Sequence, residues 1–228
     1  NTEIADVLNQ TVVDRETLAQ WPLSCVEKIT CSDGSTWVCK SNHHPCDLEG
    51  QFYAQVNSPY VIKPVHIQSS PPHQTIIYHY IDGLPYSLVN LNKKNETDKD
   101  FPKYLRPILA SINQPDLPSY LKIDNEEKFL STFRSMISSL SQLVDGGIYS
   151  SVTLEEIETL SGIIESYTIL DLALKNTALV HGDFTVDNIL YDKAADQLFF
   201  LDWQRPIYGS PLIDEYSFIK SRKIDPDP

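Results

Sequence analysis

The sequence predicts an α+β protein with two lobes, a β-rich antiparallel lobe over residues 1–82 and a mainly helical lobe over residues 83–228. Before the break at Ile81-Asp82-Gly83, short β-branched and aromatic runs alternate with turn residues. After the break, apolar residues recur with the helical period. A chain of 228 residues, 41% of them hydrophobic, is long enough for two small lobes that share a cleft.

The amino-terminal lobe begins with a predicted hairpin. Residues 26–31 and 36–40 are rich in β-formers, and Asp33-Gly34 between them supplies the positive φ angles of a tight turn. Apolar residues recur on one face of residues 48–56, which predicts a short helix. Two further strands are predicted, at residues 65–67 and 75–80.

The carboxy-terminal lobe begins with residues 84–123, where Pro, Asn, Asp and Lys predict loops with short helical pieces. Asp124 with Glu127 predicts the capped start of an amphipathic helix. A capping box that begins at Thr153 predicts a second long helix, which runs to about Leu174. A hairpin is predicted from strands at residues 189–191 and 198–201.

Charge and composition narrow the classes of partner. The formal net charge is −13, which argues against a nucleic-acid partner because Lys and Arg must replace the phosphate counterions. The same charge is compatible with a cationic substrate. No apolar run is long enough to span a bilayer and none resembles a signal peptide, so we expect no membrane partner and a cytoplasmic location. Nothing in the sequence indicates an oligomeric state.

The cysteines favour a reducing compartment. All four lie near the amino terminus and none forms a Cys-x-x-Cys pair, so a zinc site is not expected. A disulfide between Cys31 and Cys39 is geometrically feasible across the hairpin, and free thiols are the simpler interpretation.

The most informative segment is His181–Leu190, followed by the apolar run that ends at Asp202-Trp203. It places Asp183, Asn188 and Asp202 in the order that phosphoryl transfer from ATP needs, with one carboxylate for the acceptor hydroxyl and two oxygen ligands for Mg²⁺. Taken singly, the first two are ordinary turn residues. A metal-dependent hydrolase is the more remote alternative, because the other histidines have no ligand-like spacing.

These motifs resemble those of the aminoglycoside phosphotransferase and choline kinase family, small-molecule relatives of the protein kinases. That family has a His-Gly-Asp-x-x-x-x-Asn loop and an Asp-Trp motif. The resemblance implies a bilobal protein-kinase-like fold and transfer of the γ-phosphoryl group of ATP to a hydroxyl of a small molecule. It implies that Asp183 orients or deprotonates that hydroxyl, that Asn188 and Asp202 hold Mg²⁺, and that His181 is structural.

The resemblance extends more weakly to the amino-terminal lobe. It implies that Lys40, at the end of a strand, reaches the α- and β-phosphates, and that Glu49 holds this lysine by an ion pair, with Asp47 as its rival. Backbone groups of the connector at Tyr80 and Ile81 would meet the adenine edge.

A third motif, Gly-x-Pro-x-x-Asp at residues 209–214, also resembles the family. There the acidic residue buttresses the catalytic loop, which implies this role for Asp214, and a helix N-cap is the alternative.

The chain departs from the family pattern in three places. The expected phosphate loop at residues 20–25 contains no glycine, so we expect either a weak grip on phosphate or a grip supplied by hydroxyl groups. No Ala-Pro-Glu segment follows Asp202, which argues against a protein substrate. Relatives continue through further helices, so residues 84–123 are expected to build the acceptor pocket, unless that pocket is reduced. A kinase-shaped binding module without transfer activity is therefore the alternative function.

The acceptor itself is left open by the sequence. Aminoglycosides, other amino sugars, choline-like amines and plain sugars all fit. A group of acidic residues near the proposed pocket slightly favours a cationic acceptor, although a solvated helix start is the better explanation of these residues. The group comprises Asp116, Asp124, Glu126 and Glu127.

Overall fold

The computed structural model describes residues 2–45, 48–88, 105–114 and 116–223. The helices are α1 (Thr2–Leu8), α2 (Leu48–Gln55), α4 (Glu126–Asp145), α5 (Leu154–Ile164), α6 (Tyr167–Leu174) and α7 (Leu212–Ser221), with 3-10 turns η1 (Tyr86–Leu88) and η2 (Val186–Asn188). The strands are β1 (Val12–Trp21), β2 (Ser24–Cys31), β3 (Thr36–His43), β4 (His66–Ser70), β5 (His73–His79), β6 (Leu84–Pro85), β7 (Leu121–Lys122), β8 (Ala178–Val180), β9 (Ile189–Asp192), β10 (Gln197–Phe200) and β11 (Ile207–Gly209). Residues 105–112 are also helical.

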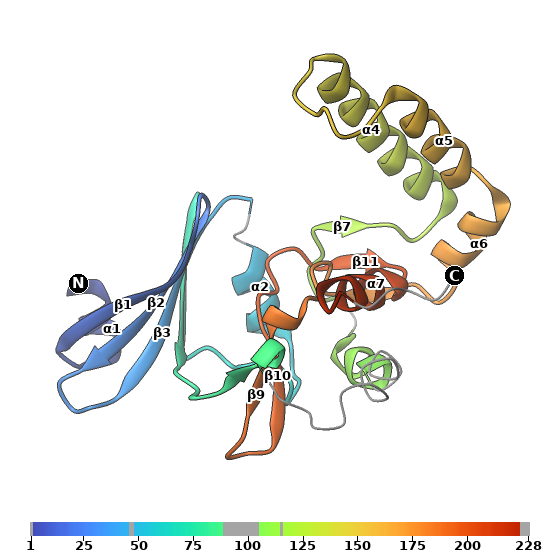
Figure 1. Ribbon diagram of the computed structural model, residues 1–228. Helices are drawn as coiled ribbons and strands as arrows, with labels where there is room; N and C mark the ends of the chain where they lie inside the picture. The colour runs from blue at the N-terminus through green and yellow to red at the C-terminus, as the bar shows by residue number, and fades with distance from the viewer. Residues whose placement is uncertain (1, 46–47, 89–104, 115, 224–228) are drawn as a thin grey trace.

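The amino-terminal part is a five-stranded antiparallel sheet in the order β1-β2-β3-β5-β4 (Figure 1). The predicted hairpin forms β2 and β3, and Gly34 in its turn has a φ angle of 84°. Strand β1 was not predicted, because its charged, mostly exposed residues lack an alternating apolar pattern. Such a composition is typical of an edge strand.

Each face of this sheet packs against a separate hydrophobic core. On one face Ile29, Cys31, Cys39 and Ile77 are buried together with partly buried residues of α1. The other face belongs to a larger core that continues through α2 into β10 and α7. Cys25, Cys31 and Cys39 are free thiols, as the simpler interpretation predicted, and Cys46 lies outside the described residues.

The connector after β5 is tied to the carboxy-terminal part. Strand β6 pairs with β9, and β9 pairs with β10 in the predicted hairpin. Gly83 lies so close to this hairpin that a Cβ atom would be 2.7 Å from Cγ of Leu190, which explains the glycine at the break. The predicted boundary between residues 82 and 83 falls in this connector and stays a prediction.

A third small sheet leads directly into the catalytic-loop motif. Strand β11 pairs parallel to β7 and antiparallel to β8. Because β8 ends at Val180, this sheet fixes the point at which the motif at His181 begins. Helix α7 starts just after β11 and places Phe218 in the main core.

Two expectations about the helices need correction. Asn125, not Asp124, caps α4 and accepts from the backbone N–H of Lys128 at 3.0 Å, while Asp124 forms ion pairs with Lys122 and Lys128. The capping box at Thr153 is present, but its helix ends at Ile164, and a new cap at Ser166 starts α6 instead of one helix to Leu174. Figure 1 shows α4 and α5 running side by side and projecting away from the sheets. No described helix is long and apolar enough to cross a membrane.

Candidate functional site

The loop that follows β8 carries Asp183 and turns on a glycine. Gly182 has a φ angle of 83°, and a Cβ atom there would lie 2.7 Å from the backbone oxygen of Arg205. Only glycine fits both requirements without strain. The turn leaves the side chain of Asp183 exposed, which is the accessibility that a group reacting with an incoming hydroxyl needs.

Buried groups beneath the loop hold its backbone. Asp214, with 0% of its surface exposed, accepts hydrogen bonds from the backbone N–H of His181 at 2.7 Å and of Gly182 at 2.9 Å. Burial raises the pKa of Asp214 above its ordinary value, although the two N–H donors oppose the rise. Asp214 therefore buttresses the loop, and the alternative of a helix N-cap is wrong because α7 has Pro211 in that position.

His181 is a structural residue, as predicted. It is buried, its Nε2 lies 2.6 Å from the backbone oxygen of Leu201, and its Nδ1 lies 3.3 Å from the backbone N of Asp183. A carbonyl can only accept and an amide N–H can only donate, so the ring carries its proton on Nε2. The ring thus joins the Asp183 loop to the segment before Asp202.

A hydrogen bond within the loop fixes the orientation of the Asn188 side chain. Its amino group donates to the backbone oxygen of Asp183 at 2.8 Å, which turns its amide oxygen away from the loop backbone. The backbone oxygen of Asn188 accepts from the N–H of Leu201 at 2.9 Å, one residue before Asp202. Asn188 is therefore bonded to Asp183 and to Leu201, the residue before Asp202.

Asp202 lies in a strained backbone position. Its φ angle of 68° is in the left-handed region, which costs a residue other than glycine about 1–3 kcal/mol. The bonds of Leu201 to His181 and Asn188 hold the preceding residue and so fix this conformation. Such strain is typical of functional positions.

Lys40 connects Asp202 to the amino-terminal sheet. Its Nζ lies 2.8 Å from Oε2 of Glu49, in the first turn of α2, and 2.6 Å from Oδ1 of Asp202. Glu49 is 0% exposed and Lys40 is 7% exposed, so this ion pair is almost dry. Trp203 adds an apolar link by stacking on Phe52 of α2, with ring centroids 4.4 Å apart.

The charges of this cluster influence one another. Burial alone would lower the pKa of Lys40, but the carboxylates of Glu49 and Asp202 outweigh it and raise that pKa. Burial raises the pKa of Glu49, and the adjacent lysine only partly opposes the rise. Lys40 therefore remains an ammonium group at neutral pH. Asp47, the rival of Glu49, lies outside the described residues.

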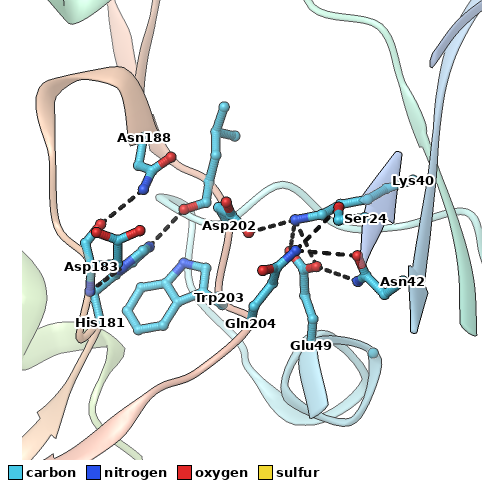
Figure 2. A network of polar contacts seen from close by, with 12 residues as sticks. Ser24, Lys40, Asn42, Glu49, His181, Asp183, Asn188, Asp202, Trp203 and Gln204 are labelled. Carbon is cyan, nitrogen blue, oxygen red and sulfur yellow. Dashed lines mark hydrogen bonds and ion pairs between the residues drawn. The ribbon is translucent and has the colours of Figure 1, made fainter. Parts of the chain in front are cut away.

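Figure 2 shows Asp183 and Asn188 on one side of Asp202, and Lys40 with Glu49 on its other side. The structure thus brings together five of the seven residues that the sequence predicted for the site. It also adds Asn42 and Gln204, which sequence reasoning missed because single amide side chains carry no recognisable motif.

The other two predicted residues lie in the connector. The backbone N–H of Tyr80 donates to the oxygen of Thr36 at 3.1 Å, and the ammonium group of Lys28 lies 4.2 Å from the ring centroid of Tyr80. The oxygen of Ile81 accepts from the N–H of Gly83 at 2.8 Å in a tight turn. Their contact with adenine stays a prediction.

The donor set fits Mg²⁺ better than a softer metal. The described residues contain no group of three His, Cys, Asp or Glu side chains placed to hold an ion. Asp202 and the amide oxygen of Asn188 instead offer hard oxygen donors. Mg²⁺ typically takes one or two such donors and completes its shell with water and phosphate.

The structure describes only part of the region that was expected to bind the acceptor. Residues 84–123, expected to build the acceptor pocket, lie partly outside the described residues. A depression is found elsewhere, between α4, α5 and α6, and none of the predicted site residues lines it. Its lining residues are Glu126, Glu165, Leu170, Asp171, Leu174 and Lys175.

Comparison with solved structures shows the same fold in small-molecule phosphotransferases. The macrolide 2'-phosphotransferase MphH from Brachybacterium faecium matches with a TM-score of 0.63 and 14% identity, over 99% of this chain and 83% of that one. The aminoglycoside phosphotransferase APH(3'')-Id from Streptomyces rimosus matches with a TM-score of 0.56 and 14% identity, over 92% and 78%.

A third structure, of APH(2'')-IIa in a ternary complex with streptomycin and ATP, matches with a TM-score of 0.59 and 20% identity, over 94% of this chain and 73% of that one. These matches confirm the predicted bilobal, kinase-like α+β fold. No curated protein matches the chain.

The sequence also matches a family model. The model of the ecdysteroid kinase-like family covers residues 102–223, which include the catalytic-loop motif, Asp202 and Asp214. This match and the phosphotransferase neighbours confirm the resemblance that the motifs indicated. The chain belongs to the ecdysteroid kinase-like family and is a small-molecule kinase.

Proposed function

We propose that this kinase uses ATP and Mg²⁺ to transfer the γ-phosphoryl group to a hydroxyl of a small molecule. The observation that carries the proposal is the position of Asp202. One of its oxygens contacts the ammonium group of Lys40, and the residue before it is bonded to Asn188. A cation for phosphate and oxygen ligands for a metal therefore belong to one cluster, as phosphoryl transfer requires.

Lys40 and the metal ligands act on the charge of the nucleotide. Lys40, held by Glu49, exchanges its contact with Asp202 for the phosphates when ATP binds. Asn188 and Asp202 would hold Mg²⁺, which would neutralise negative charge on the phosphates. Because these groups are oriented before the reaction, little reorganisation is needed at the transition state.

Asp183 acts on the acceptor. Its exposed carboxylate aligns the hydroxyl and accepts its proton as the oxygen bonds to the γ-phosphorus. The bond from that phosphorus to the β–γ bridging oxygen breaks, and ADP leaves. The connector at Tyr80 and Ile81 supplies the backbone groups that meet the adenine edge.

The acceptor is best sought among molecules with several hydroxyl groups. Two structural neighbours are named for macrolides or aminoglycosides, and the family is named for ecdysteroids. The net charge of −13 is compatible with a cationic acceptor, whereas an ecdysteroid is neutral. A screen of aminoglycosides, macrolides, ecdysteroids and choline-like amines, in which ADP formation is measured with each compound, separates these classes. The cytoplasmic location stays a prediction.

The role of Asp183 is tested by replacing it with asparagine. Loss of the proton acceptor is expected to lower kcat by about 10²–10⁴-fold, because that is the usual contribution of a positioned general base. The Kd for MgATP, measured by calorimetry, should stay within about twofold of the wild-type value because Asp183 does not hold the nucleotide.

Asp187→Asn is the matched control, because Asp187 is an exposed carboxylate on the same loop. Its kcat should equal that of the wild type. Turnover by Asp183→Asn at the wild-type rate would refute the assignment. The alternative, a kinase-shaped module without transfer activity, requires that the wild-type protein bind MgATP and form no ADP with any acceptor.

A further inference from the structure

A chain of amide groups forms a second polar link between the Asp202 segment and the amino-terminal sheet (Figure 2). The side-chain amino group of Gln204 lies 3.2 Å from Oδ1 of Asn42 and 3.3 Å from Oγ of Ser24. Asn42 in turn donates to Oε2 of Glu49 at 2.7 Å. Ser24 and Asn42 are 9% and 3% exposed, so water competes little for these bonds.

The charge of Glu49 fixes the direction of the whole chain. A carboxylate only accepts, so Asn42 must present its amino group to Glu49 and its oxygen to Gln204. Gln204 must then present its amino group, whose two hydrogens reach Asn42 and Ser24. The hydroxyl of Ser24 acts as an acceptor in this bond, and its own hydrogen remains to be donated elsewhere.

The sequence positions of these residues connect the chain to nucleotide binding. Ser24 begins β2 at the glycine-free turn that follows β1, and it pairs in register with Asn42. Lys40 lies two residues before Asn42 on the same face of β3. Gln204 follows Asp202 by two residues. One amide therefore contacts both the phosphate-loop turn and the strand that carries the lysine.

We propose that Gln204, acting through Asn42 and Ser24, is a positioning residue for ATP; this inference rests on the proposed function. When MgATP binds, Lys40 and Asp202 must exchange their mutual contact for phosphate and metal. None of the bonds of Gln204 has to break in that exchange. Gln204 thus keeps the turn at Ser24 and the carboxylate of Glu49 in place while the charged contact is lost.

The test compares Gln204→Ala, Asn42→Ala and the double variant. Loss of one hydrogen-bonded link is expected to raise the KM for ATP about tenfold, a typical effect for a buried hydrogen bond, and to leave the KM for the acceptor unchanged. The double variant should lose no more than about twofold beyond the larger single effect, because both changes break the same chain. Gln142→Ala, an exposed glutamine on α4, is the matched control.

Two further measurements keep the outcome clear. The Kd for MgATP, obtained by calorimetry, should rise in parallel with the KM for ATP. The unfolding midpoint in urea shows whether each variant is folded under the assay conditions. A Gln204→Ala enzyme that is folded and has the wild-type KM and Kd for ATP would overturn the inference. So would an equal rise in the KM for ATP and for the acceptor, because that is the effect of general loosening of the protein.

Failure of the proposed function has a different signature. If the wild-type protein bound MgATP without forming ADP, transfer would be refuted, and the calorimetric comparison of Gln204→Ala with the wild type would still decide the positioning role. If the wild-type protein bound no MgATP, both proposals would fall. If turnover were normal and the Gln204→Ala Kd unchanged, the positioning role alone would fall.

Discussion

The two sides of the candidate site are built in opposite ways. On the lysine side, Lys40 and Glu49 are 7% and 0% exposed, and they are held by direct contact between charges. On the loop side, Asp183 is exposed and Asn188 is half-buried. Their position depends on a buried carboxylate, Asp214, that accepts from two backbone N–H groups of the loop.

The difference agrees with the role that the proposed function gives to each side. A group that meets an incoming acceptor has to be accessible, so the loop side keeps its support beneath the surface. A cation that steadies phosphates interacts more strongly in dry surroundings, but burying its charge costs free energy unless a partner is present. Replacing a charged residue on the lysine side should therefore affect stability as well as function, whereas Asp183 should affect function alone.

The largest effect on stability is expected from Lys40→Met. This change leaves the carboxylate of Glu49 buried without a cation, and breaking a buried pair in this way typically costs about 3–5 kcal/mol. Urea denaturation monitored by tryptophan fluorescence gives the free energy of unfolding. The double variant Lys40→Met/Glu49→Leu should recover part of the loss, because no uncompensated charge remains. Equal stability of Lys40→Met and Asp183→Asn would contradict the comparison between the two sides.

The loss in Lys40→Met should depend on pH. Burial raises the pKa of Glu49 in the folded protein, and removal of Lys40 raises it further above its unfolded value of about 4.3. The folded state then binds more protons than the unfolded state, so the free energy of unfolding falls as pH rises above that value. The variant should therefore be destabilised more at pH 8 than at pH 5. Unfolding curves at the two pH values, with the double variant as control, measure this difference.

A smaller effect is expected from Asp214→Asn on the loop side. An asparagine oxygen can still accept, but its amino group faces a backbone N–H of His181 or Gly182 and leaves it unpaired. One buried unpaired donor costs about 1–3 kcal/mol. We expect this loss of stability together with a lower kcat, because the loop that carries Asp183 loosens. Asp187→Asn is the control, and an Asp214→Asn protein with unchanged unfolding and kcat would show that the loop is held by other contacts.

The smallest effect is expected on the reactivity of a cysteine thiol, and it tests whether the two faces of β3 differ in accessibility. Cys39 precedes Lys40 and lies on the opposite face, where burial raises the pKa of its thiol to about 11. At pH 8 about one in a thousand of such thiols is ionised, so alkylation by iodoacetamide should be very slow. In a Cys46→Ser background, half-buried Cys25 should react first, and Cys39 should react only in urea. Mass spectrometry of the labelled peptides gives the order in which the thiols are alkylated. Early labelling of Cys39 would show that the apolar face of β3 becomes exposed to solvent in the folded protein.

Much of the local structure could be predicted from the sequence. The hairpin around Gly34, the capping box at Thr153 and the order Asp183, Asn188 and Asp202 are all encoded within a few neighbouring residues. The errors occurred where local rules allow two answers. Adjacent Asp124 and Asn125 are both residue types that cap helices well. The side chain of Asp124 contacts lysines instead, and Asn125 caps the helix.

By itself, the sequence determined which chemical groups are present and their order along the chain, because turns, caps and apolar periods are short-range properties. Only the tertiary structure decided that Lys40 also meets Asp202, and that Gln204 reaches Asn42. Lys40 and Asp202 lie 162 residues apart in sequence. No local pattern encodes such contacts. They form because the main core packs α2 and β5 against β10 and Trp203, which brings the strand that carries the lysine to the end of the Asp202 segment.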